Sequence, residues 1–409
     1  MRVLQITAAD SSGQQFNGLV LNRHLRKLGH SADLAVLHAS LGENHVFELA
    51  QGPLISRINP RLTKLEERLG LQSLLPVASL SLYRDPRYLK ADLVHLQVPH
   101  GVPMLSLFNL PIMSRQKAML WTIHDPWLST GHCIYPLDCN RWQTGCGKCP
   151  DLSRHISVSR DRTHFMWRIK KTILQHSKLH LVLASPWMMQ FVAQSPILRH
   201  LPRHHIPHGV DTEIYKPGNK DRCRQELGIP LDAQVLLFRV PPPANTFKGV
   251  EQIKAALAAL QLKRPTWLLV LDEIGRLEEL RSKYQIMELG WLNDSLKIAK
   301  VFAAADVFLM PSSAEAFGLM AVEAMASGTP VIVAQGTALP QVVQAPRGGL
   351  AVPQNDAPAL AAAIESIFDA PALKQKLIEN ALEIVRENYT VELYVQRHLE
   401  LYKRLLHGG

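Results

Sequence analysis

Long hydrophobic runs are missing from this chain of 409 residues. No segment reaches the roughly 18 unbroken apolar residues that a membrane-spanning helix needs. The chain opens as a strand, Met1 to Ile6, rather than as a leader peptide. Signatures of zinc fingers, helix-turn-helix motifs and RNA-binding RNP motifs are missing as well, so nothing supports binding of nucleic acid. We therefore expect a cytoplasmic protein.

Cysteine is scarce, and its copies are unevenly placed. Four of the five cysteines, Cys133, Cys139, Cys146 and Cys149, fall within seventeen residues of the loop 131–150. In a reducing cytosol this crowding favours four thiolates on a tetrahedral zinc ion over stable disulfides. Four sulfur ligands leave no open coordination position, so the zinc would be structural, with His132 as a substitute ligand. Two disulfides or free thiols are the alternatives.

Acidic residues are few in the first half of the chain. Residues 1–210 hold 24 Lys+Arg and 12 Asp+Glu, a net charge of +12. The other residues hold 21 and 23, a net charge of −2, and the two values sum to the +10 of the whole chain. The excess positive charge should meet an anionic partner. A lipid diphosphate acceptor in an anionic membrane would fit, with the protein peripheral on the inner face of the plasma membrane.

Short apolar strands alternate with helical stretches along the whole sequence. This alternation is typical of doubly wound parallel sheets, and it occurs twice, which predicts two α/β domains. Proline and glycine interrupt it between Ile206 and Pro217, where we place the domain boundary. The predicted strands are 3–7, 32–37, 93–96, 119–123 and 179–184 in the first half, and 235–238, 267–271, 286–289, 307–310 and 331–334 in the second.

The segment from Ser312 to Val331 carries the strongest functional signal. It predicts a polar loop, a helix over 319–326 and a buried strand. Glu315 and Glu323 bracket roughly 12 Å of helix axis, which matches the length of a nucleotide sugar. Between them, the free backbone N–H groups of Phe317, Gly318 and Leu319 form a positive pole that suits a diphosphate. We interpret the segment as a nucleotide-sugar clamp, with a solvated helix carrying two surface acids as the alternative.

This segment resembles the Glu-x7-Glu motif of retaining glycosyltransferases of family 4, which have the GT-B fold. The resemblance covers nearly the whole chain and implies two Rossmann-like domains with parallel sheets facing a central cleft. It implies that Glu315 binds hydroxyl groups of the donor sugar and that Glu323 binds the ribose. The four-cysteine loop and the neighbouring Thr122 to Trp127 resemble family members of exopolysaccharide synthesis, including that of colanic acid. The implied domains are 1–208 for the acceptor, 209–389 for the donor and 390–409 as a helix returning to the first domain.

The second half holds further donor-binding candidates. Lys248 precedes Gly249 after a strand, where its charge can neutralise a departing nucleoside diphosphate, and Arg239 at the strand end is a candidate for a second charge. The resemblance implies that backbone groups of Gly290, Trp291 and Leu292 hold the base. Ordinary surface cations and a plain strand-to-helix turn are the alternatives.

The first half holds catalytic candidates, acceptor-side candidates and one donor-binding candidate. His124 and Asp125 emerge together at the end of a central strand, where open parallel sheets place their ligand sites. We expect His124 to orient the sugar and Asp125 to position the acceptor or the histidine. His95 and His100 follow the preceding strand and are acceptor-side candidates, while Gly13 aligns with a phosphate-binding loop of the family.

Together with these residues, the family resemblance implies a retaining hexosyltransferase. It would move a hexose from a UDP- or GDP-linked donor to a glycan or lipid-linked oligosaccharide, in exopolysaccharide or cell-surface glycan synthesis. Because Lys248 and a helix dipole stabilise the leaving group in this reading, no catalytic metal is expected. Two alternatives stay open: an epimerase of nucleotide sugars with the same fold, and a non-catalytic scaffold that binds sugar nucleotides in a polysaccharide assembly complex.

Overall fold

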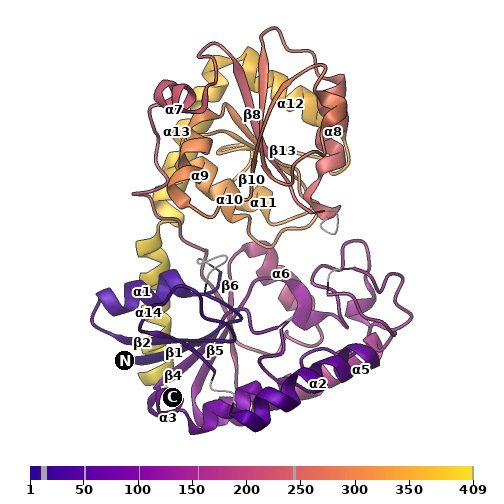
Figure 1. Cartoon of the computed structure of the whole chain (residues 1–409), viewed down its shortest axis with the longest axis vertical. Coiled ribbons are helices and arrows are strands. Elements are labelled where there is room, and N and C mark those ends of the chain that lie inside the picture. The colour runs from indigo at the N-terminus through magenta and orange to yellow at the C-terminus, as the bar shows by residue number, and fades with distance from the viewer. Residues whose placement is uncertain (11–15, 50–51, 101, 155, 243–245, 408–409) are drawn as a thin grey trace. The chain divides into compact units, whose positions relative to one another are not determined.

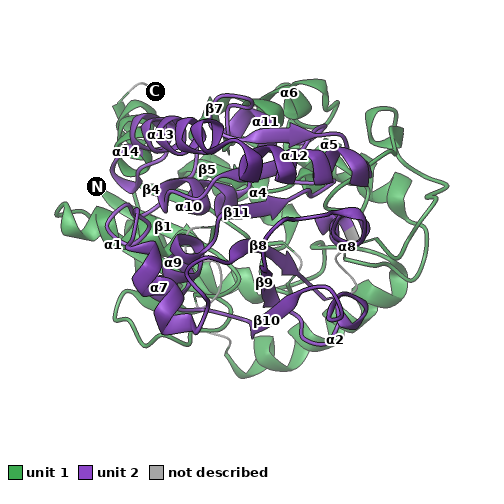
Figure 2. Ribbon diagram, turned by 90° about the horizontal axis from the view of Figure 1, so that it is seen from above, with its two compact units in different colours: residues 1–206, 394–409 green, residues 207–393 purple. Residues whose placement is uncertain are grey.

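The chain forms two compact units. The computed structural model describes residues 1–10, 16–49, 52–100, 102–154, 156–242 and 246–407. Unit 1 comprises residues 1–206 and 394–409, and unit 2 comprises residues 207–393 (Figure 2). The sequence placed these two boundaries after residues 208 and 389. Each unit is built on a parallel β-sheet with intervening helices, which confirms the predicted α/β class.

Unit 1 contains a parallel sheet of seven strands in the order β3-β2-β1-β4-β5-β6-β7 (Figure 1). Every strand except the first is reached through a crossover, so all carboxyl ends lie at one edge. The strands are β1 (Arg2–Ile6), β2 (Ser31–Val36), β3 (Val46–Glu48), β4 (Leu93–Leu96), β5 (Ala118–Ile123), β6 (His180–Leu183) and β7 (Arg203–His205). The helices are α1 (Leu19–Lys27), α2 (Pro53–Leu69), α3 (Pro86–Lys90), α4 (Leu110–Gln116), α5 (Thr163–Gln175) and α6 (Pro186–Gln194).

The last helix, α14 (Val391–His407), lies against the sheet of unit 1 (Figure 1). Its buried face presents Tyr394, His398 and Tyr402 at a spacing of four residues, the repeat that places side chains on one face of a helix. His95 of β4 has its Nδ1 atom 2.6 Å from the Tyr402 hydroxyl, and its ring stacks on His398 at 5.5 Å. Buried hydrogen bonding therefore fixes the end of the chain to the first unit.

Unit 2 contains a parallel sheet of six strands in the order β10-β9-β8-β11-β12-β13. Helices α8 and α12 cover one face, where Ile253, Leu257 and Ile364 pack on apolar side chains of the strands. The strands are β8 (Gln234–Val240), β9 (Thr266–Asp272), β10 (Gln285–Gly290), β11 (Val307–Met310), β12 (Val331–Ala334) and β13 (Leu350–Val352). The helices are α7 (Lys220–Leu227), α8 (Val250–Ala259), α9 (Ser295–Ala304), α10 (Leu319–Ala326), α11 (Leu339–Val342), α12 (Ala357–Asp369) and α13 (Pro371–Asn388).

Three strands were not predicted: β3, β7 and β13. Each has three residues and lies at the edge of its sheet. A strand of this length holds too few residues to show an alternating or continuous apolar pattern, so only pairing with a neighbour defines it. Among the described residues, no helix combines the length and the apolar character needed to cross a membrane.

Candidate functional site

Two side chains predicted to bind the donor meet in unit 2. The Nζ atom of Lys248 donates a hydrogen bond to Oε2 of Glu315 at 2.7 Å, and both side chains are partly buried. Lys248 ends the short 3₁₀ helix Thr246–Lys248 after β8, and Glu315 lies in the loop between β11 and α10. Because β8 and β11 are neighbours in the sheet, their following loops meet at one edge, which is the usual ligand site of an open parallel sheet.

Backbone contacts hold these two loops together. The Ser313 N–H donates to the Phe247 carbonyl at 2.7 Å, and the Ser313 hydroxyl donates to the same oxygen at 3.2 Å. Gly249 has φ +75°, and a Cβ atom there would lie 2.2 Å from the Pro311 carbonyl oxygen. Glycine is therefore required after Lys248, because any side chain would drive the two loops apart.

Helix α10 begins beside Glu315 with Gly318 as its N-cap. Gly318 has φ +93°, and a Cβ atom there would lie 2.2 Å from Leu339. The side chains of Phe317 and Leu319 are buried, and Phe317 packs edge-on against His208 and Tyr389. These two side chains therefore belong to the core of the unit, and a ligand can meet only the backbone here. The first N–H groups of a helix have no acceptor within the helix, which leaves them available for an anion.

Glu323 lies on the second turn of α10 and exposes only 9% of its surface. Burial raises its pKa to about 7, although a hydrogen bond with Tyr215 and the positive charge of Arg239 act in the opposite direction. The carboxyl group is therefore poised between its neutral and charged forms near neutral pH. Tyr215, which sequence reasoning missed, is buried at the start of the unit and supplies this contact.

Arg239, the candidate for a second cation, is ion-paired in the structure, as Lys248 is. Its Nε atom donates to Oδ2 of Asp272 at 2.7 Å, and its Nη1 atom approaches the Met320 sulfur at 3.3 Å. Asp272 ends β9, the strand beside β8, so the pair joins two adjacent carboxyl ends. The charge of Arg239 is largely balanced within the protein. Asp272 could have been found from the sequence, because it directly follows the predicted strand 267–271.

The predicted base-binding turn has an unusual exposed aromatic ring. Gly290 ends β10 with φ +64°, at an irregularity in the pairing with β9. Trp291 follows with 68% of its surface exposed, and the Arg239 guanidinium lies 5.9 Å from the centre of its ring. Leu292 is partly buried. The sequence assigned only backbone groups here, whereas the structure adds an indole face that can stack on a planar ligand.

Unit 1 brings His100, His124 and Asp125 to the carboxyl ends of β4 and β5. Oδ2 of Asp125 lies 3.0 Å from Nε2 of His100, and Oδ1 accepts the Trp127 N–H at 2.8 Å. Burial would raise the pKa of Asp125, but the charge and hydrogen bond of His100 outweigh it, so this pKa is lowered. Burial lowers the pKa of His124 to about 4. At neutral pH His124 is therefore an uncharged hydrogen-bonding group beside an ionised carboxylate.

Two candidates of the first half, His95 and Gly13, are not placed at this site by the structure. His95 has no exposed surface, and its two ring nitrogens lie within 2.7 Å of Tyr402 and Thr122 hydroxyl groups. We therefore assign His95 to the core, where it anchors α14, rather than to an acceptor site. Its strand-end position gave the same sequence signal as a ligand-binding histidine, because burial by a helix 300 residues away is invisible in the local pattern. Gly13 lies outside the described residues.

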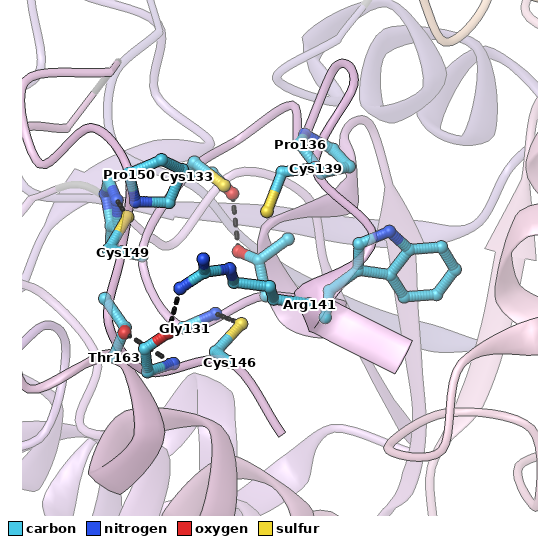
Figure 3. A pocket seen from close by; sticks show the side chains of 13 residues that line it. Gly131, Cys133, Pro136, Cys139, Arg141, Cys146, Cys149, Pro150 and Thr163 are labelled. Atoms are coloured by element: carbon cyan, nitrogen blue, oxygen red, sulfur yellow. Dashed lines mark hydrogen bonds between the residues drawn. The ribbon is translucent and has the colours of Figure 1, made fainter. Parts of the chain in front are cut away.

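The four cysteines line one small cavity of about 20 Å³ together with His132 (Figure 3). Burial raises the pKa of Cys133 to about 11 and that of Cys146 to about 12. Cys146 accepts the Gly131 N–H at 3.2 Å, and the Cys149 sulfur lies 3.3 Å from Nε2 of His132. As placed in the described part of the chain, no three His, Cys, Asp or Glu side chains converge closely enough to hold a metal ion.

Lys170 of α5 lies buried beneath this loop. Its Nζ atom donates to the Trp127 carbonyl at 2.8 Å and to the Thr130 carbonyl at 3.1 Å, and it lies 3.6 Å from the centre of the Trp127 ring. The Trp127 ring in turn stacks on His100 at 4.7 Å. One buried lysine thus joins the base of the cysteine loop to the segment that positions Asp125.

The geometry of unit 2 agrees with its sequence relatives. Residues 219–384 match the family described as Glycosyl transferases group 1. The group 1 match contains Lys248, Glu315 and Glu323, so it covers the whole donor-side cluster. It supports the prediction of a glycosyltransferase.

Curated relatives match about half of the chain. A D-inositol 3-phosphate glycosyltransferase of Corynebacterium glutamicum (strain R) is 36% identical over 197 residues, which are 44% of this chain and 46% of the relative. The "Putative colanic acid biosynthesis glycosyl transferase WcaC" of Escherichia coli (strain K12) is 27% identical over 250 residues, 58% of this chain and 56% of the relative. The chain thus spans about half the length of the curated relatives it matches.

Solved structures match the whole chain. Sucrose-phosphate synthase from Thermosynechococcus elongatus covers 100% of both chains with a TM-score of 0.73 and 23% identity. Anabaena HepE in complex with UDP and glucose covers 98% of this chain and 99% of its own, with a TM-score of 0.70 and 17% identity. At these identities the likeness shows the fold alone. It confirms the predicted GT-B fold.

The raised pKa of Glu323 makes a testable prediction about stability. Because the folded protein holds this proton up to about pH 7, it binds more protons than the unfolded chain between about pH 4.5 and 7. The contribution of Glu323 to the free energy of unfolding therefore falls as the pH rises from about 4.5 to 7, by about 3 kcal/mol at most. Glu323→Gln removes the effect, so the variant should gain stability relative to the native protein between pH 5 and pH 8.

Urea unfolding at both pH values measures this difference. Glu251→Gln, an exposed glutamate in the first turn of α8, is the matched control and should show the same difference at both pH values. A stability difference between Glu323→Gln and the native protein that stays constant from pH 5 to pH 8 would contradict the buried, protonated state.

Proposed function

We propose that this protein is a retaining glycosyltransferase that moves a hexose from a nucleoside diphosphate sugar to a glycan or lipid-linked oligosaccharide. The observation that supports it most is the Lys248–Glu315 pair at the carboxyl ends of β8 and β11, beside the amino end of α10. The ammonium of Lys248, the carboxylate of Glu315 and the first backbone N–H groups of α10 lie close together there. That combination matches the diphosphate and the hexose of one donor molecule.

In the proposed reaction the bond between the sugar C1 and the diphosphate oxygen breaks first. Lys248 and the N–H groups of α10 stabilise the negative charge that develops on the leaving diphosphate. The acceptor hydroxyl attacks C1 from the same face, and its proton passes to a leaving diphosphate oxygen. Glu315 holds sugar hydroxyls, so the configuration at C1 is kept without a covalent enzyme intermediate and without a catalytic metal.

The remaining residues serve recognition. We assign Glu323 to the ribose and the turn Gly290 to Leu292 to the base, with the exposed Trp291 ring stacking on it. HepE, whose structures contain UDP, glucose and UDP-glucose, supports a UDP-linked donor. We assign the acceptor to unit 1, where the uncharged His124 orients the sugar and Asp125 positions the acceptor. The WcaC relative supports a role in exopolysaccharide synthesis.

A panel of UDP- and GDP-linked sugars tests this function. A bound donor should raise the melting temperature, and incubation with a lipid-linked acceptor should release nucleoside diphosphate and give a product with the donor's anomeric configuration. Conversion of the donor to another sugar without an acceptor would indicate an epimerase instead. Donor binding with neither hydrolysis nor transfer, across acceptors, would indicate the non-catalytic scaffold.

We also propose that the four-cysteine loop holds a structural zinc ion. All four sulfurs line one cavity, and four thiolates are a complete donor set for tetrahedral zinc. Since the sulfurs do not converge as placed, the loop would tighten on binding. We expect about one zinc ion per chain by elemental analysis, and loss of the metal in Cys146→Ser/Cys149→Ser. Cys223→Ser is the control, because Cys223 belongs to α7 of unit 2. Metal-free protein with four reduced thiols would disprove the zinc site.

A further inference from the structure

Unit 1 has a second cavity, at the opposite edge of its sheet from His124 and Asp125. Its volume is about 280 Å³, and it lies where β5 and β6 begin. A strand of six residues separates the two edges by about 20 Å, so this cavity is distinct from the site proposed above. It is lined by Ser114, Arg115, Gln116, Lys117, Ala118, Met119, Lys178, His180 and Leu405.

The cavity lining is strongly basic. Arg115, Lys117 and Lys178 contribute three positive charges, and none of the described residues that line it is acidic. Such an uncompensated cluster attracts an anion, because the local potential of several like charges adds in a concave surface.

His180, which lines the cavity, is paired with a second histidine. Nδ1 of His180 lies 3.0 Å from Nε2 of His204 on the neighbouring strand β7. Burial, together with the smaller effects of His180 and Arg404, lowers the pKa of His204 to about 4. The pair therefore stays uncharged at neutral pH, and a ring N–H of an uncharged imidazole can still donate to an anion.

One of the three cations is fixed in place. Lys117 donates through Nζ to the carbonyl oxygens of Leu89 and Ala91, each at 2.8 Å. Two of its three N–H donors are thus used within the protein, and Lys117 contributes a positive charge of fixed position to the cavity lining. Arg115 and Lys178 are exposed, and the planar guanidinium of Arg115 suits two oxygens of one phosphate group.

An apolar surface adjoins the basic cavity. Phe108 and Ile112 each expose 49% of their surface. Ile112 lies on α4 three residues before Arg115, and Phe108 lies in the 3₁₀ turn Leu107–Asn109 directly before α4. A phosphate bound by Arg115 would therefore lie beside two exposed apolar side chains, an arrangement that also fits a phosphate attached to an acyl chain.

We propose that this cavity is a binding site for a phosphate group, with Arg115, Lys117 and Lys178 as its cationic ligands. Both a soluble phosphate and the head group of an anionic phospholipid present this chemistry. The inference does not rest on the proposed transfer reaction, because it concerns the opposite edge of the sheet.

The experiment compares two double variants that remove the same charge from unit 1. Arg115→Gln/Lys178→Gln alters the cavity, and Lys64→Gln/Arg68→Gln alters exposed residues of α2 as the control. Lys117 is kept, because its loss would leave two carbonyl groups without a donor. Circular dichroism and melting temperature establish that both variants fold.

The first probe is inorganic phosphate, measured by calorimetry with saturating UDP to occupy the donor site. The second is co-sedimentation with phosphatidylcholine vesicles, with or without phosphatidylglycerol as a quarter of the lipid. For a soluble ligand, phosphate affinity falls at least tenfold in the cavity variant only. For a lipid head group, binding to the phosphatidylglycerol vesicles falls roughly thirtyfold in the cavity variant only. Equal binding by the two variants, or equal loss, overturns the proposal.

Discussion

Lys248→Met is expected to reduce sugar transfer by about 10² to 10³ in kcat, the loss that follows removal of one preorganised donor to a developing negative charge. Lys248 is held by a 2.7 Å hydrogen bond to Glu315 and by the loop contact at Gly249, so its ammonium is already in place before the diphosphate leaves. Methionine has a similar length but no charge. Donor affinity should fall less than kcat, because most of the charge forms only in the transition state.

Lys254→Met is the matched control for this variant. Lys254 lies on α8, six residues further along the chain, and forms an ion pair with Glu279 at 2.7 Å with the same 22% exposed side chain as Lys248. It should keep native turnover. Glu315→Gln should also lose transfer while the protein stays folded, since the amide keeps the shape of the side chain. Native kinetics in Lys248→Met, with an unchanged melting temperature, would exclude Lys248 as the partner of the leaving group.

Asp306→Asn is expected to destabilise the protein by about 3–5 kcal/mol, which is the cost of leaving buried charges unpaired. Asp306 precedes β11 and is almost fully buried. Its carboxylate accepts hydrogen bonds from Lys220 at 3.0 Å, Lys374 at 2.6 Å and Arg224 at 2.7 Å, and from the Val235 N–H at 2.8 Å. The asparagine would face three cations with no charge to balance them.

Urea unfolding at pH 7 measures this loss. Burial alone would raise the pKa of Asp306, but Lys220, Lys374 and Arg224 hold it well below the usual range. Its contribution is therefore fully present above the pKa of an unfolded aspartate and is lost as pH falls through the lowered value. Asp369→Asn, which breaks an exposed pair with Lys263 at 3.2 Å, is the control and should change stability little. Equal effects of the two variants would contradict a buried ionic network.

Much of the donor side could be predicted because its signals are local. The spacing of Glu315 and Glu323, the glycine after Lys248 and the glycine before Leu319 each reflect a backbone requirement of a few consecutive residues. The alternation of strands and helices likewise follows from local periodicity. These local features were sufficient to predict the fold class. They also identified Lys248 and Glu315 as candidate donor ligands without knowledge of their contact.

Other features depended on partners distant in the chain. Asp306 carried no motif, and its three cations come from α7 and α13. His95 gave the signal of a ligand-binding histidine but is covered by α14. Arg239 was a candidate for a second charge, and its ion pair with Asp272 of the next strand was not foreseen. In each case the deciding contact joins residues more than 30 positions apart, which no local pattern encodes.

The sequence by itself determined the two α/β units and identified the candidate ligands of a sugar diphosphate, because periodicity, glycine placement and charge are properties of short segments. Only the tertiary structure decided which charged groups are paired internally and which remain for a ligand. It paired Lys248 with Glu315 and Arg239 with Asp272. It also gathered Arg115, Lys117 and Lys178 around a cavity that no motif marked. The physical reason is that the state of a charge depends on what lies within a few ångströms of it.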